Sequence, residues 1–398
     1  MIIGVVGKAN VGKSTFFKSA TLAEVLIANY PFATIKPNEG VGYIRVECAD
    51  KDFGVQCNPR EGFCLNHTRF VPVKMIDVAG LVPGAHEGKG LGNQFLDDLN
   101  QADAFIHVID AAGSTNERGE PIQPLSYDPA NDIRFLEFEL DMWYLRLIKK
   151  GWDKFTRQVK QEKANVKKAL HKQLSGLRVT EQLIESTMEK YALPEDMTLW
   201  SEKELLSFAS DLRRETKPMI IACNKIDVKG AEDNFIRLQQ EFPGYLLVAC
   251  SAESELALRE AAKHGLIKYA PGDSDFEIAD KGKLSEKQAK ALEFIRENIL
   301  KKFGSTGVQQ VIDASVYKIL KYIAIFPGGI NKLADQYGNV MPDCFLLPEG
   351  STALDFAYRV HTDLGNKFIR AIDAKSKKTV GKEHLLKHRD VLEIVAGK

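Results

Sequence analysis

An α/β fold built on a mostly parallel sheet is predicted by short apolar runs, several of which end in a polar motif. Ile2–Val6 is β-branched apart from one glycine and is too short for a buried helix, so we expect a central strand there. Runs of the same kind occupy residues 71–77, 218–223 and 245–250. Strands that alternate with helix-length segments along a chain are typical of this fold class.

The first strand leads into a glycine-rich loop of the form G-x-x-x-x-G-K-S. Gly7 and Gly12 allow the backbone to curl with its N–H groups inward, and a helix expected over residues 14–22 offers its positive end to the same anion. Lys13 can then reach the β- and γ-phosphates, and the Ser14 hydroxyl can bind Mg²⁺. A plain glycine-rich turn is the alternative, but the flanking strand and helix favour a phosphate-binding loop. The predicted nucleotide contacts in this loop are Gly7, Lys8, Ala9, Asn10, Val11, Gly12, Lys13, Ser14 and Thr15.

Two further strands end in motifs that are typical of a guanine-nucleotide site. Asp77 and Gly80 form a D-x-x-G motif, in which the carboxylate can hold Mg²⁺ and the glycine N–H can bond the γ-phosphate. Asn224, Lys225 and Asp227 form an N-K-x-D motif after the third strand. The Asp227 carboxylate can accept hydrogen bonds from N1–H and the 2-amino group of guanine. Adenine lacks that donor pair and would leave the carboxylate unpaired, at a cost of roughly 1–3 kcal/mol.

The fourth strand ends in Ser251 and Ala252, which we expect to line the base. Each motif alone has an ordinary explanation, such as a surface turn or a charged loop. Four motifs in this order, each at the end of an apolar strand, predict a domain that binds GTP or GDP with Mg²⁺ and hydrolyses GTP.

Three segments extend this interpretation by resemblance to a known family. Residues 29–38 (Asn-Tyr-Pro-Phe-Ala-Thr-Ile-Lys-Pro-Asn) and the glycine-rich residues 77–96 resemble the two switch segments of Obg- and YchF-type GTPases. Residues 347–357 (Leu-Pro-Glu-Gly-Ser-Thr-Ala-Leu-Asp-Phe-Ala) resemble the signature of a TGS domain, a small ubiquitin-like β-grasp module. The resemblance covers the nucleotide domain and the C-terminal module well, and the middle only in outline. It implies a YchF-related GTPase of the archaeal or eukaryotic kind.

The resemblance also assigns roles to the switch residues. Thr34 matches the second Mg²⁺ ligand of the family, so Ser14 and Thr34 are expected on the metal with Asp77 behind them. Lys13, Thr34 and Gly80 are the predicted catalytic residues, because they contact or sense the γ-phosphate.

One position of the second switch departs from many GTPases. Leu81 stands where they carry the glutamine that orients the attacking water. Leucine cannot hydrogen-bond water, so we expect slow intrinsic hydrolysis; the family shares this apolar residue. His86 and Glu87 are the nearest ionisable groups that could guide water, but residues of this kind are more often simply solvent-facing switch residues.

The choice of nucleotide depends on the N-K-x-D motif. Some YchF relatives have an altered motif and, by resemblance, prefer ATP. Asn224, Lys225 and Asp227 are all intact here, which favours GTP. Two alternatives stay open: a YchF-type ATPase, and a nucleotide-dependent binding protein with negligible turnover.

Asn10 has two possible roles within the phosphate loop. In loops of the form G-x-x-N-x-G-K-S this residue can help to bind K⁺ beside the phosphates, where a cation would neutralise charge in the transition state. The alternative is that Asn10 only stabilises the turn through its own side chain.

The segment between the D-x-x-G and N-K-x-D motifs is longer than one helix requires. Apolar residues at spacings of three, four and seven predict an amphipathic helix over residues 155–177, with further helices over 133–150, 179–193 and 201–216. We therefore expect an inserted helical hairpin, coiled-coil-like in character. The predicted domains are a GTPase domain in two parts (1–130 and 215–322), the helical insertion (131–214) and the TGS domain (323–398). In the second part, helices are expected over residues 285–303 and 308–324. The final module is expected to have strands over 344–347, 368–372 and 391–395, with a helix over 351–361.

Composition and length agree with a multi-domain globular protein. The chain has 398 residues, of which 44% are apolar and 27% charged. There is no stretch of eighteen apolar residues, and Met1 enters a core strand directly, so no signal peptide or membrane contact is expected. We predict a cytoplasmic protein, with a monomer as the favoured state.

The net charge is zero, but basic residues gather in two regions. Residues 149–178 carry ten Lys or Arg against two acidic residues, and residues 366–389 carry eight against two. Either region alone is explained by a solvated surface. Together, in a chain of this family, they favour the ribosome or RNA as the partner, and DNA is not expected.

Three cysteines and a histidine lie close together in the sequence: Cys48, Cys57, Cys64 and His67. Their spacing lacks the C-x-x-C pair of a zinc knuckle. Free thiols, a Cys57–Cys64 disulfide and a zinc site therefore all remain open. Cys223, Cys250 and Cys344 lie in apolar runs and are expected in the core.

Overall fold

The computed structural model describes residues 1–21, 38–78, 99–330, 332–335 and 337–397. These residues group into two compact units. The first unit comprises Met1–Ser14 and Ile76–Cys250, and the second comprises Thr15–Met75 and Ser251–Lys398.

The main sheet has seven strands in the order β2-β4-β1-β5-β6-β7, with β3 paired to β4. Neighbours β1 and β5, β5 and β6, and β6 and β7 are parallel, whereas β3 and β4 are antiparallel. The strands are β1 (Ile2–Val6), β2 (Glu39–Glu47), β3 (Phe63–Leu65), β4 (Thr68–Asp77), β5 (Ala104–Asp110), β6 (Met219–Asn224) and β7 (Leu246–Ala249). Every residue of β5 and β6 is buried, as expected for parallel strands that are covered on both faces. The predicted fold class is confirmed.

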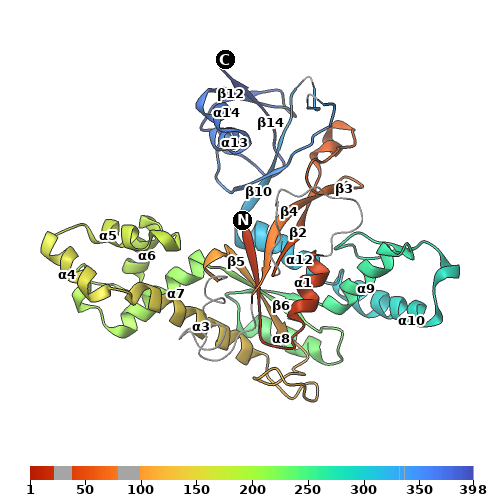
Figure 1. Ribbon diagram of the computed structural model, residues 1–398, viewed down its shortest axis with the longest axis horizontal. Helices are drawn as coiled ribbons and strands as arrows, with labels where there is room; N and C mark the ends of the chain where they lie inside the picture. Colours follow the sequence, from red (N-terminus) through yellow and green to blue (C-terminus); the bar gives the residue numbers. More distant parts are fainter. Residues whose placement is uncertain (22–37, 79–98, 331, 336, 398) are drawn as a thin grey trace. The chain divides into compact units, whose positions relative to one another are not determined.

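Three helices follow the strands that carry the predicted motifs. These are α1 (Lys13–Thr21) after β1, α8 (Ala231–Glu241) after β6 and α9 (Ala252–Lys263) after β7. Figure 1 shows the carboxyl ends of β1 and β6 leading into the loops before α1 and α8. In parallel α/β sheets, ligands bind at these strand ends, so the fold places the predicted motifs where a ligand site is expected.

The inserted segment of the first unit folds into five helices, which Figure 1 shows as one cluster. They are α3 (Ala130–Lys149), α4 (Trp152–Glu162), α5 (Val166–Gln173), α6 (Glu181–Lys190) and α7 (Glu202–Thr216). Trp152, Trp200 and Phe208 form an aromatic chain in its core, with ring centroids 5.6 and 5.0 Å apart. Ser201 and Glu204 form a capping box at the start of α7.

The helix that we predicted over residues 155–177 is interrupted. Lys163 ends α4 with a left-handed backbone (φ 49°), and the Asn165 side chain then caps α5 by accepting a hydrogen bond from the Lys168 amide. Apolar spacing continued through the break because both helices pack on the same core. The insertion is therefore a compact helical cluster and not one long hairpin.

The second unit contains a helical part and a five-stranded sheet. The helical part has α10 (Glu286–Ile295), α11 (Lys301–Phe303) and α12 (Val308–Ala314), with a π-helical turn after α10 and another after α12. A short hairpin of β8 (Ile267–Lys268) and β9 (Glu277–Ile278) precedes them. The helix predicted over 308–324 is too long: Lys321 has a positive φ of 54° and ends it, and residues 322–327 form a strand instead.

The five-stranded sheet has the order β11-β10-β14-β12-β13. Its elements are β10 (Tyr322–Pro327), β11 (Phe345–Pro348), α13 (Ala353–Val360), α14 (Thr362–Asn366), β12 (Phe368–Asp373), β13 (Thr379–Val380) and β14 (Val391–Ala396). Phe356 of α13 packs on Ile325, Ala371 and Leu392 of the strands, which forms a separate small core. Thr352 and Asp355 form a capping box at the start of α13.

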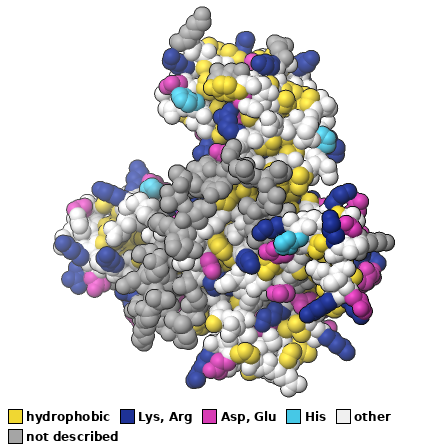
Figure 2. Space-filling view, turned by 45° about the vertical axis from the view of Figure 1, so that its right-hand side comes forward, with side chains coloured by type: hydrophobic (Ala, Val, Ile, Leu, Met, Phe, Trp, Pro, Cys, Tyr) yellow, Lys and Arg dark blue, Asp and Glu magenta, His cyan; other side chains and the backbone are white. Residues whose placement is uncertain are grey.

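Basic and acidic side chains are interspersed over the face of the molecule that Figure 2 shows. No helix among the described residues is both long enough and apolar enough to cross a membrane.

Candidate nucleotide-binding site

The glycine-rich loop between β1 and α1 is shaped by close backbone approaches. A Cβ atom on Gly7 would lie 2.5 Å from the Val108 carbonyl oxygen, and one on Gly12 would lie 2.2 Å from Nδ2 of Asn224. Gly12 also has a φ of +90°, which side chains rarely adopt. Asn224 Nδ2 donates a hydrogen bond to the Val11 carbonyl oxygen at 2.9 Å. The N-K-x-D motif therefore directly supports the glycine-rich loop.

The Lys8 side chain anchors the glycine-rich loop to residues of the segment after β5. Its buried Nζ donates hydrogen bonds to Asp132 Oδ1 at 2.9 Å and to the Thr115 carbonyl oxygen at 3.1 Å, and lies 3.8 Å from the centre of the Tyr127 ring. Burial raises the pKa of the Asp132 carboxyl, although the Lys8 charge acts in the opposite direction. The side chain of Lys8 is thus structural, which leaves only its backbone N–H for a phosphate.

A buried histidine lies on β5 within the electrostatic influence of Lys8. His107 is 1% exposed, and burial, with the Lys8 charge adding to it, lowers its pKa to about 3 from 6.5. The imidazole is therefore neutral in the folded protein near neutral pH.

His107 should make the protein sensitive to acid. Below about pH 6.5 the unfolded chain takes up a proton that the folded chain does not, so this group lowers the unfolding free energy by about 1.4 kcal/mol per pH unit until its folded pKa is reached. As pH falls from 7 to 5, we expect the urea midpoint of the wild type to fall more than that of a His107→Gln variant, so that the gap between them narrows. The exposed His264 supplies the control, His264→Gln, whose difference from wild type should not change in this way. A constant gap for His107→Gln would contradict the prediction.

Asn10 also supports the loop geometry. It has a left-handed backbone (φ 62°), and its Nδ2 donates a hydrogen bond to the Gly119 carbonyl oxygen at 2.9 Å. The Asn10 side chain therefore joins the glycine-rich loop to a neighbouring loop, whereas the sequence alternative had it stabilise only its own turn. The side-chain oxygen of Asn10 is the atom that a cation would use.

Lys13 and Asp77 form an ion pair through Nζ and Oδ1, and both side chains are mostly buried. Ser14 follows in the first turn of α1 and is exposed. The Lys13 ammonium group and the Asp77 carboxylate thus meet where α1 begins, and the Ser14 hydroxyl is on the next residue of the chain. Hydroxyl and carboxylate oxygens are ligands that suit Mg²⁺, so the described residues fit a magnesium–nucleotide site.

The N-K-x-D turn depends on a buried carboxylate at the end of β5. Lys225 Nζ lies 2.9 Å from Asp110 Oδ2 and 3.1 Å from Ser114 Oγ. Asp110 also accepts hydrogen bonds from the amides of Ala112 and Ser114, both at 3.1 Å, and from the Thr115 hydroxyl at 3.0 Å. These contacts hold Lys225 in its left-handed conformation (φ 62°).

The segments predicted to contact the base, the N-K-x-D turn and the start of α9, are joined by a backbone hydrogen bond at the end of β7. The Ile226 amide donates to the Cys250 carbonyl oxygen at 3.1 Å, which joins the N-K-x-D turn to the end of β7. Asp227 follows in this turn and is half-buried. Ser251 is buried and caps α9, whose first residue is Ala252.

Several predicted residues lie outside the part of the chain that the structure describes. They are Thr34, Gly80, Leu81, His86 and Glu87. In contrast, Asp110, Thr115, Tyr127 and Asp132 support the site and were missed by the sequence analysis. An Asp at the end of the apolar run Phe-Ile-His-Val-Ile-Asp was the one available signal for Asp110.

Models of known families match three parts of the chain. A 50S ribosome-binding GTPase model matches residues 2–134, an Obg-like GTPase YGR210-like, G4 motif-containing domain matches residues 222–328, and a TGS domain matches residues 334–396. An uncharacterized GTP-binding protein of Methanocaldococcus jannaschii is 50% identical over 396 residues, which covers 99% of each chain. The chain belongs to the YchF/Obg-like family of GTP-binding proteins.

Two further relatives of this YchF/Obg-like protein bear on its fold and function. The crystal structure of a GTP-binding protein from Pyrococcus horikoshii OT3 matches with 42% identity and a TM-score of 0.79, and all of both chains is covered. The ribosome-binding ATPase YchF of Buchnera aphidicola is 27% identical over 417 residues, which covers 98% of each chain.

Proposed function

We propose that this YchF/Obg-like protein is a GTP-hydrolysing molecular switch that acts on the ribosome. One observation carries the nucleotide part of the proposal: Asn224 of the N-K-x-D motif is hydrogen-bonded to Val11 of the glycine-rich loop at 2.9 Å. The base-reading motif and the phosphate-binding motif therefore form one assembly, with Lys13 and Asp77 beside it.

Magnesium and the phosphates would be held at the start of α1. Ser14 and Thr34 would bind the metal and Asp77 would support it, and bound Mg²⁺ would neutralise charge on the β- and γ-phosphates. Lys13 would leave its ion pair with Asp77 to contact the same phosphates. The Oδ1 atom of Asn10 would face a K⁺ ion, in which case turnover in K⁺ should exceed turnover in Na⁺.

Hydrolysis would be slow without a partner. Leu81 offers no hydrogen bond to the attacking water, whereas Thr34 and Gly80 would sense the γ-phosphate and release the switch segments when it leaves. Leu81 also favours a second candidate, a binding protein with negligible turnover. Single-turnover rates of GTP hydrolysis with and without ribosomes separate the two: stimulation by ribosomes supports the switch, and no stimulation supports the binding protein.

GTP is the proposed nucleotide, although the Buchnera relative is named an ATPase. Three groups support GTP: Asn224 and Lys225, which the structure holds through Val11 and Asp110, and the Asp227 carboxylate that follows them. An adenine base would leave that carboxylate without its two donors.

The ribosome is the proposed partner because the Buchnera relative, which is 27% identical, is named for it and because basic side chains are exposed. In the insertion, Lys160 pairs with Asp196 at 2.6 Å and Lys167 pairs with Glu185, so part of the predicted charge is neutralised. Exposed basic residues in the two regions include Lys163, Lys168, Lys172, Lys367, Arg370, Lys377 and Lys378. Such side chains suit the phosphates of ribosomal RNA.

Co-sedimentation with purified ribosomes across a salt series tests this partner. We expect tighter, saturable binding with a non-hydrolysable GTP analogue than with GDP. Replacing Lys163, Lys168 and Lys172 by Glu should weaken binding and flatten its salt dependence, because each phosphate contact contributes to the slope. The matched control is Lys287→Glu with Lys290→Glu on α10, where exposed lysines lie outside both regions. Binding that ignores the nucleotide and disappears at modest salt would contradict the proposal.

A further inference from the structure

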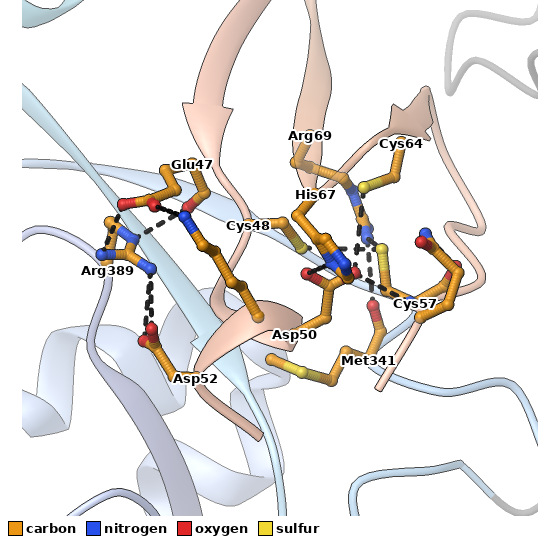
Figure 3. A network of polar contacts seen from close by, with 12 residues as sticks. Glu47, Cys48, Asp50, Asp52, Cys57, Cys64, His67, Arg69, Met341 and Arg389 are labelled. Atoms are coloured by element: carbon orange, nitrogen blue, oxygen red, sulfur yellow. Dashed lines mark hydrogen bonds and ion pairs between the residues drawn. The ribbon is translucent and has the colours of Figure 1, made fainter. Parts of the chain in front are cut away.

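Three cysteines of the second unit converge on one buried carboxylate (Figure 3). Cys48 follows β2, Cys57 lies in the next loop and Cys64 is in β3. Their sulfur atoms and an oxygen of Asp50 all lie within 4.8 Å of one another. Four potential metal ligands from separate parts of the chain therefore surround one point.

The distances match those between the ligands of a tetrahedral metal site. A zinc–sulfur bond of about 2.3 Å places neighbouring sulfur ligands about 3.8 Å apart. The sulfurs of Cys48 and Cys57 are 3.5 Å apart, and Cys64 Sγ lies 3.9 Å from Asp50 Oδ2. Little movement is needed for these atoms to bind a single ion.

Asp50 is fully buried and held in place. Its Oδ2 accepts a hydrogen bond from the Cys57 amide at 2.9 Å, and its Oδ1 lies 2.9 Å from Nδ1 of His67. A buried carboxylate requires compensation by positive charge, and carboxylates are known zinc ligands. The hydrogen bond between Asp50 Oδ1 and His67 resembles the outer-shell hydrogen bonds that orient ligands in metal sites.

Arg69 completes the electrostatic environment. Its side chain is 1% exposed, and Nη1 lies 3.4 Å from the Cys57 sulfur. The Cys48 thiol also donates a hydrogen bond to the Cys57 sulfur. Zinc binds thiolates and not thiols, and the guanidinium beside this sulfur offsets part of the negative charge of such a ligand.

We propose that Cys48, Cys57, Cys64 and Asp50 form a structural zinc site, in which His67 orients the Asp50 carboxylate. Three sulfur ligands favour a soft or borderline cation over Mg²⁺ or Ca²⁺, and four protein ligands leave no open position for catalysis. The site is independent of the proposed nucleotide function.

The zinc site holds the loop after β2 to the segment that precedes β11. Arg69 Nη1 and Nη2 donate to the carbonyl oxygens of Met341 and Pro342 at 3.1 and 2.6 Å. The amides of Asn58 and Arg60 donate to the carbonyl oxygens of Val340 and Pro342 at 2.8 and 2.9 Å. Because Cys57 precedes Asn58 in the chain and its sulfur contacts Arg69, metal binding would fix this connection within the second unit.

Zinc content of the full-length chain, purified without added metal, is the first test. We expect about one zinc ion per chain by inductively coupled plasma mass spectrometry. Cys48→Ser, Cys57→Ser and Cys64→Ser should each lose it, whereas Cys223→Ser should retain it because Cys223 lies in β6 of the other unit. Where a variant fails to fold, the wild-type chain decides: after chelation, added Co²⁺ should produce the thiolate-to-cobalt charge-transfer absorption.

The roles of Asp50 and His67 are separated by two variants. Asp50→Asn should lose zinc, whereas His67→Gln should keep it with affinity lowered about 10- to 100-fold, as for an outer-shell partner. The reverse result would make His67 the ligand and overturn this assignment.

Hydrogen exchange tests the structural consequence. Chelation should increase hydrogen exchange at residues 56–60 and 340–342. Arg389→Ala serves as a control for zinc content and should not lower it, because Arg389 contacts Glu47 and Asp52 in a separate network (Figure 3). A zinc-free wild-type chain that binds no Co²⁺ would overturn the proposal, and so would a Cys48–Cys57 disulfide found by peptide mass spectrometry.

Discussion

Replacing Asp227 by asparagine should lower the affinity for GTP by roughly 10- to 100-fold and raise the affinity for xanthosine triphosphate. The Asp227 carboxylate would accept hydrogen bonds from N1–H and the 2-amino group of guanine, and loss of a hydrogen bond to a charged group costs about 1.5–3 kcal/mol. An asparagine amide would direct N–H donors at the guanine donors. Xanthine has a carbonyl oxygen in place of the 2-amino group, so it accepts from that amide.

Competition against a fluorescent guanine nucleotide measures this change with GTP, ATP and xanthosine triphosphate. Asp233→Asn provides the matched control, because Asp233 is an exposed carboxylate in the first turn of α8. Its affinities should equal those of the wild type. Equal affinity of the wild type for GTP and ATP, unchanged in Asp227→Asn, would support the ATPase alternative instead.

The strands and motifs of the nucleotide site were predictable because they depend on local sequence. β1 matches its predicted bounds, and β4, β6 and β7 differ from theirs by a few residues at the ends. Buried parallel strands are continuous apolar runs, and glycine-rich turns require residue types that few other structures need. These signals are readable without knowledge of the tertiary structure.

The supporting residues could not be predicted, because their roles come from contacts across the fold. Lys8 occupies a variable position of the loop motif, and its partners Thr115 and Asp132 are more than 100 residues away in sequence. Asp110 supports Lys225 across a similar separation. A sequence pattern reports neither distance, so the anchoring role of the Lys8 ammonium group could not be predicted, whereas the Lys8 backbone N–H stays a predicted nucleotide contact.

The cysteine group shows the same limit. Its spacing favoured free thiols and left a disulfide and zinc open as alternatives. The chain reversal from β3 to β4 and the turn after β2 bring Cys48, Cys57 and Cys64 together around Asp50. Asp50 carries no motif, and its burial and its short distances to the three sulfurs identify it as a member of the group.

Replacing Gly12 by alanine should lower GTP affinity by about 100-fold, from backbone strain and the loss of a buried hydrogen bond, each worth about 1–3 kcal/mol. The new Cβ atom would lie 2.2 Å from Asn224 Nδ2, so the loop and the Asn224 side chain cannot both keep their places. The bond from Asn224 to the Val11 carbonyl oxygen would then break. Isothermal calorimetry with GTP measures the loss directly.

A double-mutant cycle shows whether the clash with Asn224 is the cause. Without the Asn224 amide, the Cβ atom meets no other described atom within 4 Å, so Gly12→Ala should lower GTP affinity less in an Asn224→Ala background than in the wild type, with only the backbone strain left. Gly151→Ala controls for backbone strain, because Gly151 has a φ of +77° and no atom of the described residues lies within 4 Å of its would-be Cβ atom. Losses that simply add would show that the two residues act separately. Losses that do not add would establish that the base-reading motif supports the phosphate loop, which is the coupling that makes one site of two distant segments.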